Sequence, residues 1–451
     1  MRRVAAFLSS SPIVKHSKYI LLELAIAYVI SNVNQIVINR FSTSAMAALG
    51  SASQAATFVI NLYTLISVGM SILLMRYTGP KHAGESDGVY TVSLCDAAVF
   101  GAALSLGGYL LCPLILRWMQ IPATLYAHAY SYLAVILGFS FVNAFLTVLS
   151  AVFRAYGAMR TMLIVDTVVN LLCMALNILT LYAVPPEKQT LGMYAFNGIL
   201  AQTLGCAVLL LRMKRTTGRR LLLRLRPSSL WKRIVNDTGR ILHYGLMGGM
   251  EGMIYLVGQT AVVAIVGLLG EREMLVRAYV LNITPYLVLC DTAISTAAFY
   301  VVGERAGAGD PAGARVACRQ AVWDATVATA VVGAVFLLLS MPILRLYTQD
   351  AAILRDCRRL LYICAFAEIL HCPVSMFVSS LKAVGRVGPP FAAIAPAMAL
   401  NVFGSWLFGV YLGWGLIGIW IGYMLDHVFR GITMGVAWKR WRPEPRFVKG
   451  S

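Results

Sequence analysis

Long apolar segments follow one another along the whole chain, and each is long enough to cross a bilayer as a helix. A spanning helix needs about 20 mostly apolar residues, because the hydrocarbon layer offers its backbone no hydrogen-bonding partner outside the helix itself. Twelve segments meet this requirement, at residues 18–39, 45–74, 89–113, 124–151, 160–184, 191–212, 241–268, 276–302, 318–341, 358–381, 390–412 and 415–437. The pattern predicts an all-α polytopic membrane protein with twelve transmembrane helices.

Polar residues inside these segments repeat after 228 residues. Glu23 matches Glu251, and Arg154-Ala155-Tyr156-Gly157 matches Lys382-Ala383-Val384-Gly385. Chance similarity between apolar stretches would match leucine with valine and would not keep charges and glycines in one register. A duplicated membrane domain that carries charges within its spans is typical of transporters. The repeat therefore predicts two pseudo-symmetric six-helix lobes.

The two halves meet at a basic stretch between the sixth and seventh segments. We expect an N-terminal lobe at 1–213, a basic cytoplasmic linker at 214–240, a C-terminal lobe at 241–437 and a basic cytoplasmic tail at 438–451. Because six spans separate them, both halves begin on the same side of the membrane and are parallel copies. In such folds the substrate binds between the lobes, and transport is a rocking of one lobe against the other.

The placement of lysine and arginine indicates the orientation. With a cytoplasmic N-terminus, inside segments hold 28 of the 38 basic residues and outside loops hold 9, as the positive-inside rule requires. The net charge of +19 would also suit nucleic acid, but the basic run at 212–240 is better interpreted as a linker that fixes topology and touches anionic lipid. We expect both termini in the cytoplasm and no nucleic-acid partner.

Composition excludes other classes of protein. The chain is 59% hydrophobic and 13% charged with a mean hydropathy of +0.74, and it leaves no room for a large soluble domain. Its nine cysteines stand singly, which predicts neither a disulfide framework nor a metal site. A membrane-embedded enzyme such as a prenyl transferase would need paired aspartates or a metal-ligand motif, and the sequence has none. We expect no catalytic residues and no cofactor.

Several local motifs resemble the multidrug and toxic compound extrusion (MATE) family, which belongs to the multidrug/oligosaccharidyl-lipid/polysaccharide flippase superfamily. They are a loop at 302–310, two matching turns at 153–157 and 381–385, and the glycine pattern at 415–422. The resemblance implies a monomeric antiporter of the plasma membrane, the inner membrane in bacteria. It would export small amphipathic, mostly cationic compounds, including xenobiotics, in exchange for H+ or Na+. A flippase for a lipid-linked sugar or peptide is the alternative, and a channel would show uncoupled flux.

Carboxylates within spans are candidates for ion coupling, since an ionised side chain at mid-bilayer costs about 2.5 to 3.5 kcal/mol. In the second half, Glu251 and Glu368 lie near positions where some relatives of this family carry coupling acids, and Asp291 is a further candidate. His371 follows Glu368 by three residues and could partner it. Tyr255 is predicted to line the substrate cavity near Glu251. Met253 is predicted there as well.

The first half departs from the family pattern at two positions. Asn34 and Asn177 stand where the family usually has acids, so a proton or Na+ switch there is in doubt. An amide keeps its hydrogen-bonding capacity but releases no proton near neutral pH. These two asparagines could bind substrate or could hydrogen-bond neighbouring helices.

A carboxylate lies eleven residues before each asparagine, Glu23 before Asn34 and Asp166 before Asn177. Eleven residues are about three helical turns, so each acid shares a helix face with its asparagine. We hypothesise that Glu23 and Asp166 face one another and form a displaced protonatable site. Asp166 has no twin in the repeat, because Ile394 occupies the matching position. In the alternative, each acid pairs with a nearby base, such as Lys15, Lys18, Arg154 or Arg160.

Other intramembrane acids favour structural roles. Asp96 and Asp324 lie about two turns inside their helices, close to basic loops, which predicts ion pairing or capping. Asp426 precedes Arg430 by four residues, a spacing that brings two side chains together on one helix face. We therefore predict an Asp426–Arg430 ion pair.

Overall fold

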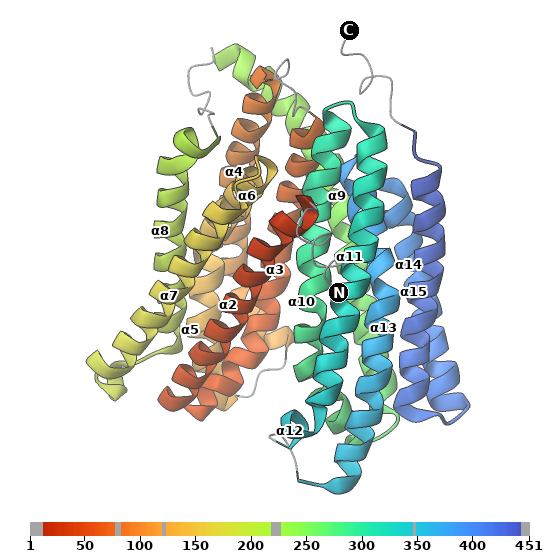
Figure 1. Cartoon of the computed structure of the whole chain (residues 1–451). Coiled ribbons are helices and arrows are strands. Elements are labelled where there is room, and N and C mark those ends of the chain that lie inside the picture. Colours follow the sequence, from red (N-terminus) through yellow and green to blue (C-terminus); the bar gives the residue numbers. More distant parts are fainter. Residues whose placement is uncertain (1–11, 77–82, 120–122, 218–226, 346–348, 443–451) are drawn as a thin grey trace. The chain divides into compact units, whose positions relative to one another are not determined.

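The computed structural model describes residues 12–76, 83–119, 123–217, 227–345 and 349–442 of the 451-residue chain. Over these ranges the regular structure is helical, and no strand occurs (Figure 1). The elements are α2 (Pro12–Phe41), α3 (Thr43–Arg76), α4 (Ala83–Trp118), α5 (Ala123–Gly138), α6 (Ser140–Ala155), α7 (Met159–Ala183), η2 (Pro186–Lys188), α8 (Leu191–Thr217), α9 (Pro227–Gly267), α10 (Glu271–Gly307), α11 (Pro311–Leu338), α12 (Ser340–Leu344), α13 (Ala351–Ala383), α14 (Gly388–Gly404), η3 (Ser405–Tyr411) and α15 (Gly415–Lys439).

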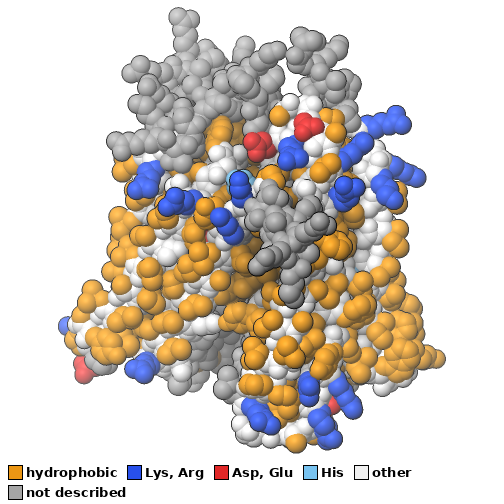
Figure 2. Space-filling model, in the orientation of Figure 1, with side chains coloured by type: hydrophobic (Ala, Val, Ile, Leu, Met, Phe, Trp, Pro, Cys, Tyr) orange, Lys and Arg blue, Asp and Glu red, His pale blue; other side chains and the backbone are white. Residues whose placement is uncertain are grey.

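Each of the twelve predicted spans coincides with helical structure. In the described part of the chain, ten helices are long and apolar enough to cross a membrane, and the pair α5 and α6, bent by 50°, makes eleven if it is one span. The predicted span 415–437 corresponds to α15, whose apolar sequence is interrupted by Asp426 and Arg430. Apolar side chains cover the visible faces of the helices, while lysine and arginine gather toward helix ends (Figure 2). The predicted all-α polytopic membrane fold is confirmed.

The chain forms two compact units. One is Leu22–Leu246, and the other combines Met1–Leu21 with Met247–Ser451, so that α2 and α9 each begin in one unit and end in the other. The predicted lobe and linker boundaries stay a prediction, and residues 218–226 of the linker and 443–451 of the tail lie outside the described residues.

The repeated Arg/Lys-Ala-x-Gly motif ends a helix in both units. Gly157 and Gly385 have positive φ angles of 72° and 76°, a conformation that glycine adopts without the penalty of a Cβ atom. Their N–H groups donate to the carbonyls of Arg154 and Lys382, at 3.0 and 2.9 Å. Together with a second bond from the following residue, this is the Schellman ending of a helix. The motif therefore places a cation in the last turn of α6 and of α13.

Two aspartates begin the helices around which the second unit is built. Asp310 accepts the N–H of Gly313 at 2.8 Å at the start of α11. Asp350 accepts the N–H groups of Ala352 and Ile353 at the start of α13, and these bonds hold the pKa of Asp350 below its ordinary value. α13 packs against α10, α11 and α15 and is therefore the central helix of this part of the second unit.

The glycine pattern at 415–422 has a packing role. Gly418 and Gly422 lie on the face of α15 that meets η3 and the end of α14, where a Cβ atom on either glycine would collide with Phe408 or Ser405. Small residues let helix backbones approach closely in a membrane, where packing is a main source of association. This close approach fixes the position of Asp426, one turn beyond Gly422 on α15.

Candidate functional site

A buried polar cluster occupies the second unit, where α10, α13 and α15 meet. Asp291 on α10 is only 2% exposed, and its Oδ2 lies 3.4 Å from Nδ1 of His371 on α13. The imidazole rings of His371 and His427 lie 4.9 Å apart, centroid to centroid, which extends the cluster to α15. Nδ1 of His427 is 3.3 Å from Oδ2 of Asp426. The four side chains form a chain of close polar neighbours across three helices.

At the α15 end of this cluster, Asp426 and Arg430 form a bidentate ion pair. Arg430 donates from Nε and one terminal nitrogen to the two carboxylate oxygens of Asp426, at 2.7 and 2.6 Å. Asp426 is fully buried and Arg430 is 6% exposed. The ion pair predicted from the i,i+4 spacing is confirmed. Because arginine remains protonated at all accessible pH values, it compensates the charge of Asp426 permanently.

Glu368 and Tyr255 lie at the edge of the same cluster. Glu368 is half-buried on α13, one turn before His371, and interacts electrostatically with both His371 and Asp291. The Tyr255 ring on α9 lies within electrostatic reach of Glu368, Asp426 and Arg430. Met253 is half-buried two residues earlier and adds no charged group. The structure thus brings four predicted residues together, namely Asp291, Glu368, His371 and Tyr255.

The charge of this cluster depends on protons. Asp426 has a permanent cation beside it, whereas His371 is the side chain that lies beside both Asp291 and Glu368 and can become positive. Histidine changes its charge near neutral pH, so a proton gained or lost by His371 alters the field at both acids. A buried group of this kind can couple proton binding to a rearrangement of helices.

Glu251 lies in a different place, in an ion pair that the repeat duplicates. Its Oε2 is 2.6 Å from Nζ of Lys382, at the end of α13. The matching residues of the first unit, Glu23 and Arg154, also form an ion pair and a hydrogen bond. Equivalent acids on α2 and α9 therefore contact equivalent cations at the ends of α6 and α13.

The first unit adds a second acid to this pair. Oδ2 of Asp166 on α7 lies 3.8 Å from a terminal nitrogen of Arg154, and its carboxyl also interacts with that of Glu23. Glu23 and Asp166 therefore lie near one another and share the base Arg154. Their role as a protonatable site stays a prediction. Ile394 stands at the mirrored position of the second unit, so among the described residues the three-residue arrangement occurs in the first unit and is not repeated at the matching positions of the second.

The two asparagines that replace expected acids are hydrogen-bonded to each other. Asn177 Nδ2 on α7 donates to Asn34 Oδ1 on α2 at 3.1 Å. Asn197 on α8 donates to Asn177 Oδ1 at 3.0 Å and to the hydroxyl of Thr180 at 2.8 Å. This polar layer joins three helices without a formal charge. A role of Asn34 and Asn177 in substrate binding stays a prediction.

The family model named MatE matches this chain twice, at residues 20–182 and 249–407, once in each half. The chain belongs to the MatE family. The predicted MATE membership is thereby confirmed, and the chain is a multi-pass membrane transporter. The matched segments contain Glu23 and Asp166, and also Asp291, Glu368 and His371 of the buried polar cluster in the second unit.

Curated relatives and solved structures agree with this assignment. The MatE chain is 24% identical over 434 residues to "Uncharacterized transporter YisQ" of Bacillus subtilis, covering 96% of this chain and 94% of that protein. It is 24% identical over 399 residues to "Probable multidrug resistance protein NorM" of Thermotoga maritima, with 87% and 84% covered. An outward-facing multidrug resistance MATE transporter superimposes with a TM-score of 0.85 at 19% identity over 98% of both chains. A MOP superfamily transporter from Pyrococcus furiosus gives 0.83 at 18% identity over 96% of both. At these identities the structural likeness shows the fold alone.

Some polar neighbours in this MatE chain were missed by the sequence analysis. His427 and Asn197 lie inside predicted spans, where any polar residue is a functional candidate, so their position was an available signal that went unused. Thr238 gave no signal, although its hydroxyl donates to Asp96 at 2.7 Å. Asp96 was predicted to form an ion pair or to cap a helix, and the contact that the structure shows is this hydrogen bond from a hydroxyl on α9.

Proposed function

We propose that this MatE-family chain is a secondary antiporter that exports amphipathic, cationic drugs or metabolites in exchange for H+. It would act as a monomer in the bacterial inner membrane with both termini in the cytoplasm, through alternating access of its two lobes, and would carry out no chemical step. Several relatives, including the Thermotoga maritima protein, bear multidrug resistance names. Those names support export of foreign compounds as the class of activity.

One observation carries this proposal, the pairing of buried Asp291 with His371 beside Glu368. Protonation and deprotonation of this group change its net charge inside the membrane, where charge is costly. The imidazole favours H+ over Na+ as the coupling ion, because histidine binds and releases protons near neutral pH. A coupling ion shifts a conformational equilibrium only if it binds one state better than the other. Movement of α10 against α13 would change the Asp291–His371 distance and supply that difference.

Transport in proteoliposomes tests the proposal. The purified chain is reconstituted, and movement of a fluorescent organic cation is recorded under a proton gradient or a sodium gradient applied separately. We expect the organic cation to move in exchange for protons when the proton gradient is applied, and not to move when the sodium gradient is applied. Protein-free liposomes should show no transport. A response to sodium alone would identify Na+ as the coupling ion. Absence of a response to either gradient would contradict an antiporter.

A second proton-binding group is proposed in the first lobe at Asp166. Arg154 can neutralise one carboxylate, while Glu23 and Asp166 both lie against it. The acid not compensated by Arg154 is the one that can exchange a proton at low energetic cost. We expect Asp166→Asn to lower proton-driven transport about tenfold, equivalent to 1.4 kcal/mol of differential proton binding. Transport rates across an external pH series measure this change.

Glu187→Gln is the matched control for Asp166→Asn, since Glu187 lies in η2 outside the spans. It removes one carboxylate and should leave the pH series unaltered. Glu23→Gln provides the complementary test, because it leaves Arg154 to pair with Asp166. If Asp166→Asn and Glu23→Gln both keep the wild-type pH response, the first-lobe acids take no part in coupling.

A further inference from the structure

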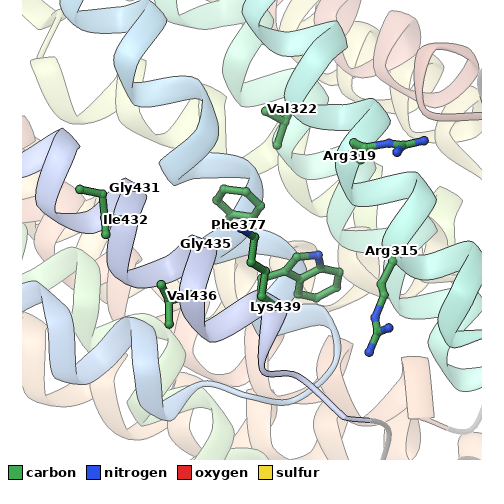
Figure 3. Close-up of a pocket in the computed structure, with 10 residues that line it drawn as sticks. Arg315, Arg319, Val322, Phe377, Gly431, Ile432, Gly435, Val436 and Lys439 are labelled. Carbon is green, nitrogen blue, oxygen red and sulfur yellow. The ribbon is translucent and has the colours of Figure 1, made fainter.

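The second unit carries a groove that is distinct from the polar cluster. It has a volume of about 650 Å³ and is lined by α11, α13 and α15 (Figure 3). Its apolar wall consists of Val322 on α11, Phe377 on α13, and Ile432 and Val436 on α15. Ile432 is 63% exposed, although it lies within a predicted span. An exposed apolar wall on spanning helices is a surface for acyl chains.

Three cations stand at one end of this wall. Arg315 and Arg319 lie one turn apart on α11, and Lys439 ends α15 (Figure 3). Among the residues that the structure describes, none of the three forms an ion pair with a carboxylate. The positive-inside rule places this end, between the α10–α11 loop and the C-terminal tail, at the cytoplasmic surface.

Tryptophan side chains pack against the cationic end of the groove. Arg315 donates to the backbone carbonyl of Trp441 at 3.0 Å and lies over its ring, 5.8 Å from the centroid. Trp438, which lines the groove, stacks on Trp441 with centroids 5.1 Å apart. Tryptophan is enriched at the depth of lipid headgroups. The groove thus has an apolar wall and, at the depth of the lipid headgroups, an end formed by tryptophans and cations.

Glycines create the space between the helices. Gly431 and Gly435 line the groove one turn apart on α15, and a Cβ atom on Gly435 would lie 3.4 Å from the Phe377 ring. A larger side chain at Gly435 would therefore fill the groove. The repeat register places Asp87 and Thr91 where the second half has Arg315 and Arg319, so the duplicated scaffold does not require these cations.

We propose that this groove binds one phospholipid with an anionic headgroup from the cytoplasmic leaflet. The phosphate would contact Arg315, Arg319 and Lys439, and an acyl chain would lie along Ile432, Val436 and Phe377. Basic pockets between helices on the cytoplasmic side suit anionic lipid. Three cations without an ion pair among the described residues favour a headgroup with a net negative charge over a zwitterionic one, in which a second cation already compensates the phosphate. The volume falls in the range of small-molecule sites. The site stands apart from ion coupling, so it can exist whether or not the proposed antiport is correct.

Fluorescence quenching tests this site on the purified full-length chain. Phosphatidylglycerol with brominated acyl chains is titrated into mixed micelles, and quenching of Trp438 is isolated by subtracting the signal of Trp438→Phe. We expect saturable quenching by brominated phosphatidylglycerol, and an affinity at least tenfold lower for brominated phosphatidylcholine. Millimolar inorganic phosphate should not compete, because it has no acyl chain. Equal quenching by both lipids, or full competition by phosphate, would overturn the proposal.

Three variants separate a shaped site from general attraction of charge. The triple variant R315Q/R319Q/K439Q should lose about 100-fold in phosphatidylglycerol affinity, at about 1 kcal/mol for each cation. Its matched control, R355Q/R358Q/R359Q, removes the same charge at the opposite end of α13 and should change affinity less than twofold. Gly435→Leu retains every charge but fills the groove, and it should abolish saturable quenching. Wild-type binding by Gly435→Leu, or equal losses in the two triple variants, would contradict a lipid site.

Discussion

Replacement of Arg430 by methionine is expected to lower the free energy of unfolding by about 3 to 5 kcal/mol, because it leaves the buried carboxylate of Asp426 without its permanent cation. Two hydrogen bonds, at 2.7 and 2.6 Å, are lost with the guanidinium. His427 remains 3.3 Å from the carboxylate but is neutral unless it binds a proton. Unfolding in detergent, followed by tryptophan fluorescence during titration with a denaturing detergent, measures the loss.

The double variant D426L/R430M separates a missing charge partner from lost packing. Buried ion pairs replaced by apolar residues of similar volume are often neutral or more stable, so the double variant should recover most of the stability lost in R430M. Arg430→Lys keeps the charge but cannot form the two-pronged contact, and it should fall between wild type and R430M. If R430M unfolds like the wild type, or the double variant is less stable than R430M, the pair does not carry this energy.

The pair Asp426–Arg430 could be predicted from the sequence because both residues lie on one helix. The 3.6-residue period places i and i+4 side chains side by side, whatever the surrounding fold. The twelve helices were predictable for a similar reason, since the bilayer imposes length and apolarity on each segment independently. One detail escaped that reasoning, as the span predicted at 124–151 bends by 50° between α5 and α6 without a proline in either helix.

Contacts between helices could be predicted only in part. The repeat showed that Glu23 corresponds to Glu251 and Arg154 to Lys382, but equivalence does not show that acid and cation touch. Each pair joins residues 131 positions apart, and their contact depends on how the helices pack. The pairing of Asp291 with His371 is of the same kind. Sequence periodicity indicates that a residue lies on a helix face, whereas the partner of that face is set by tertiary packing.

Asp291→Asn is expected to lower proton-driven export at least about 100-fold while leaving substrate binding nearly unchanged. A coupling ion must supply about 5.5 kcal/mol of differential binding to convert one conformation almost wholly into another, and an asparagine at this position binds no proton. Initial rates under a fixed proton gradient in proteoliposomes give the first quantity. Equilibrium binding of the same fluorescent cation in detergent gives the second.

Two further variants, compared with Asp291→Asn, distinguish coupling at this cluster from a general effect of lost charge. His371→Ala removes the other half of the 3.4 Å pair and should reduce proton-driven export to a similar degree. Asp356→Asn is the matched control, because Asp356 also lies on α13 but pairs with the exposed Arg272 at 2.5 Å, three turns from Glu368. It should retain export within about twofold, as expected for an exposed ion pair worth less than about 1 kcal/mol. Full proton-driven export by Asp291→Asn would exclude the second-lobe cluster from the coupling mechanism. Asp166, which lies beside Arg154 together with Glu23, would then be the group to test next.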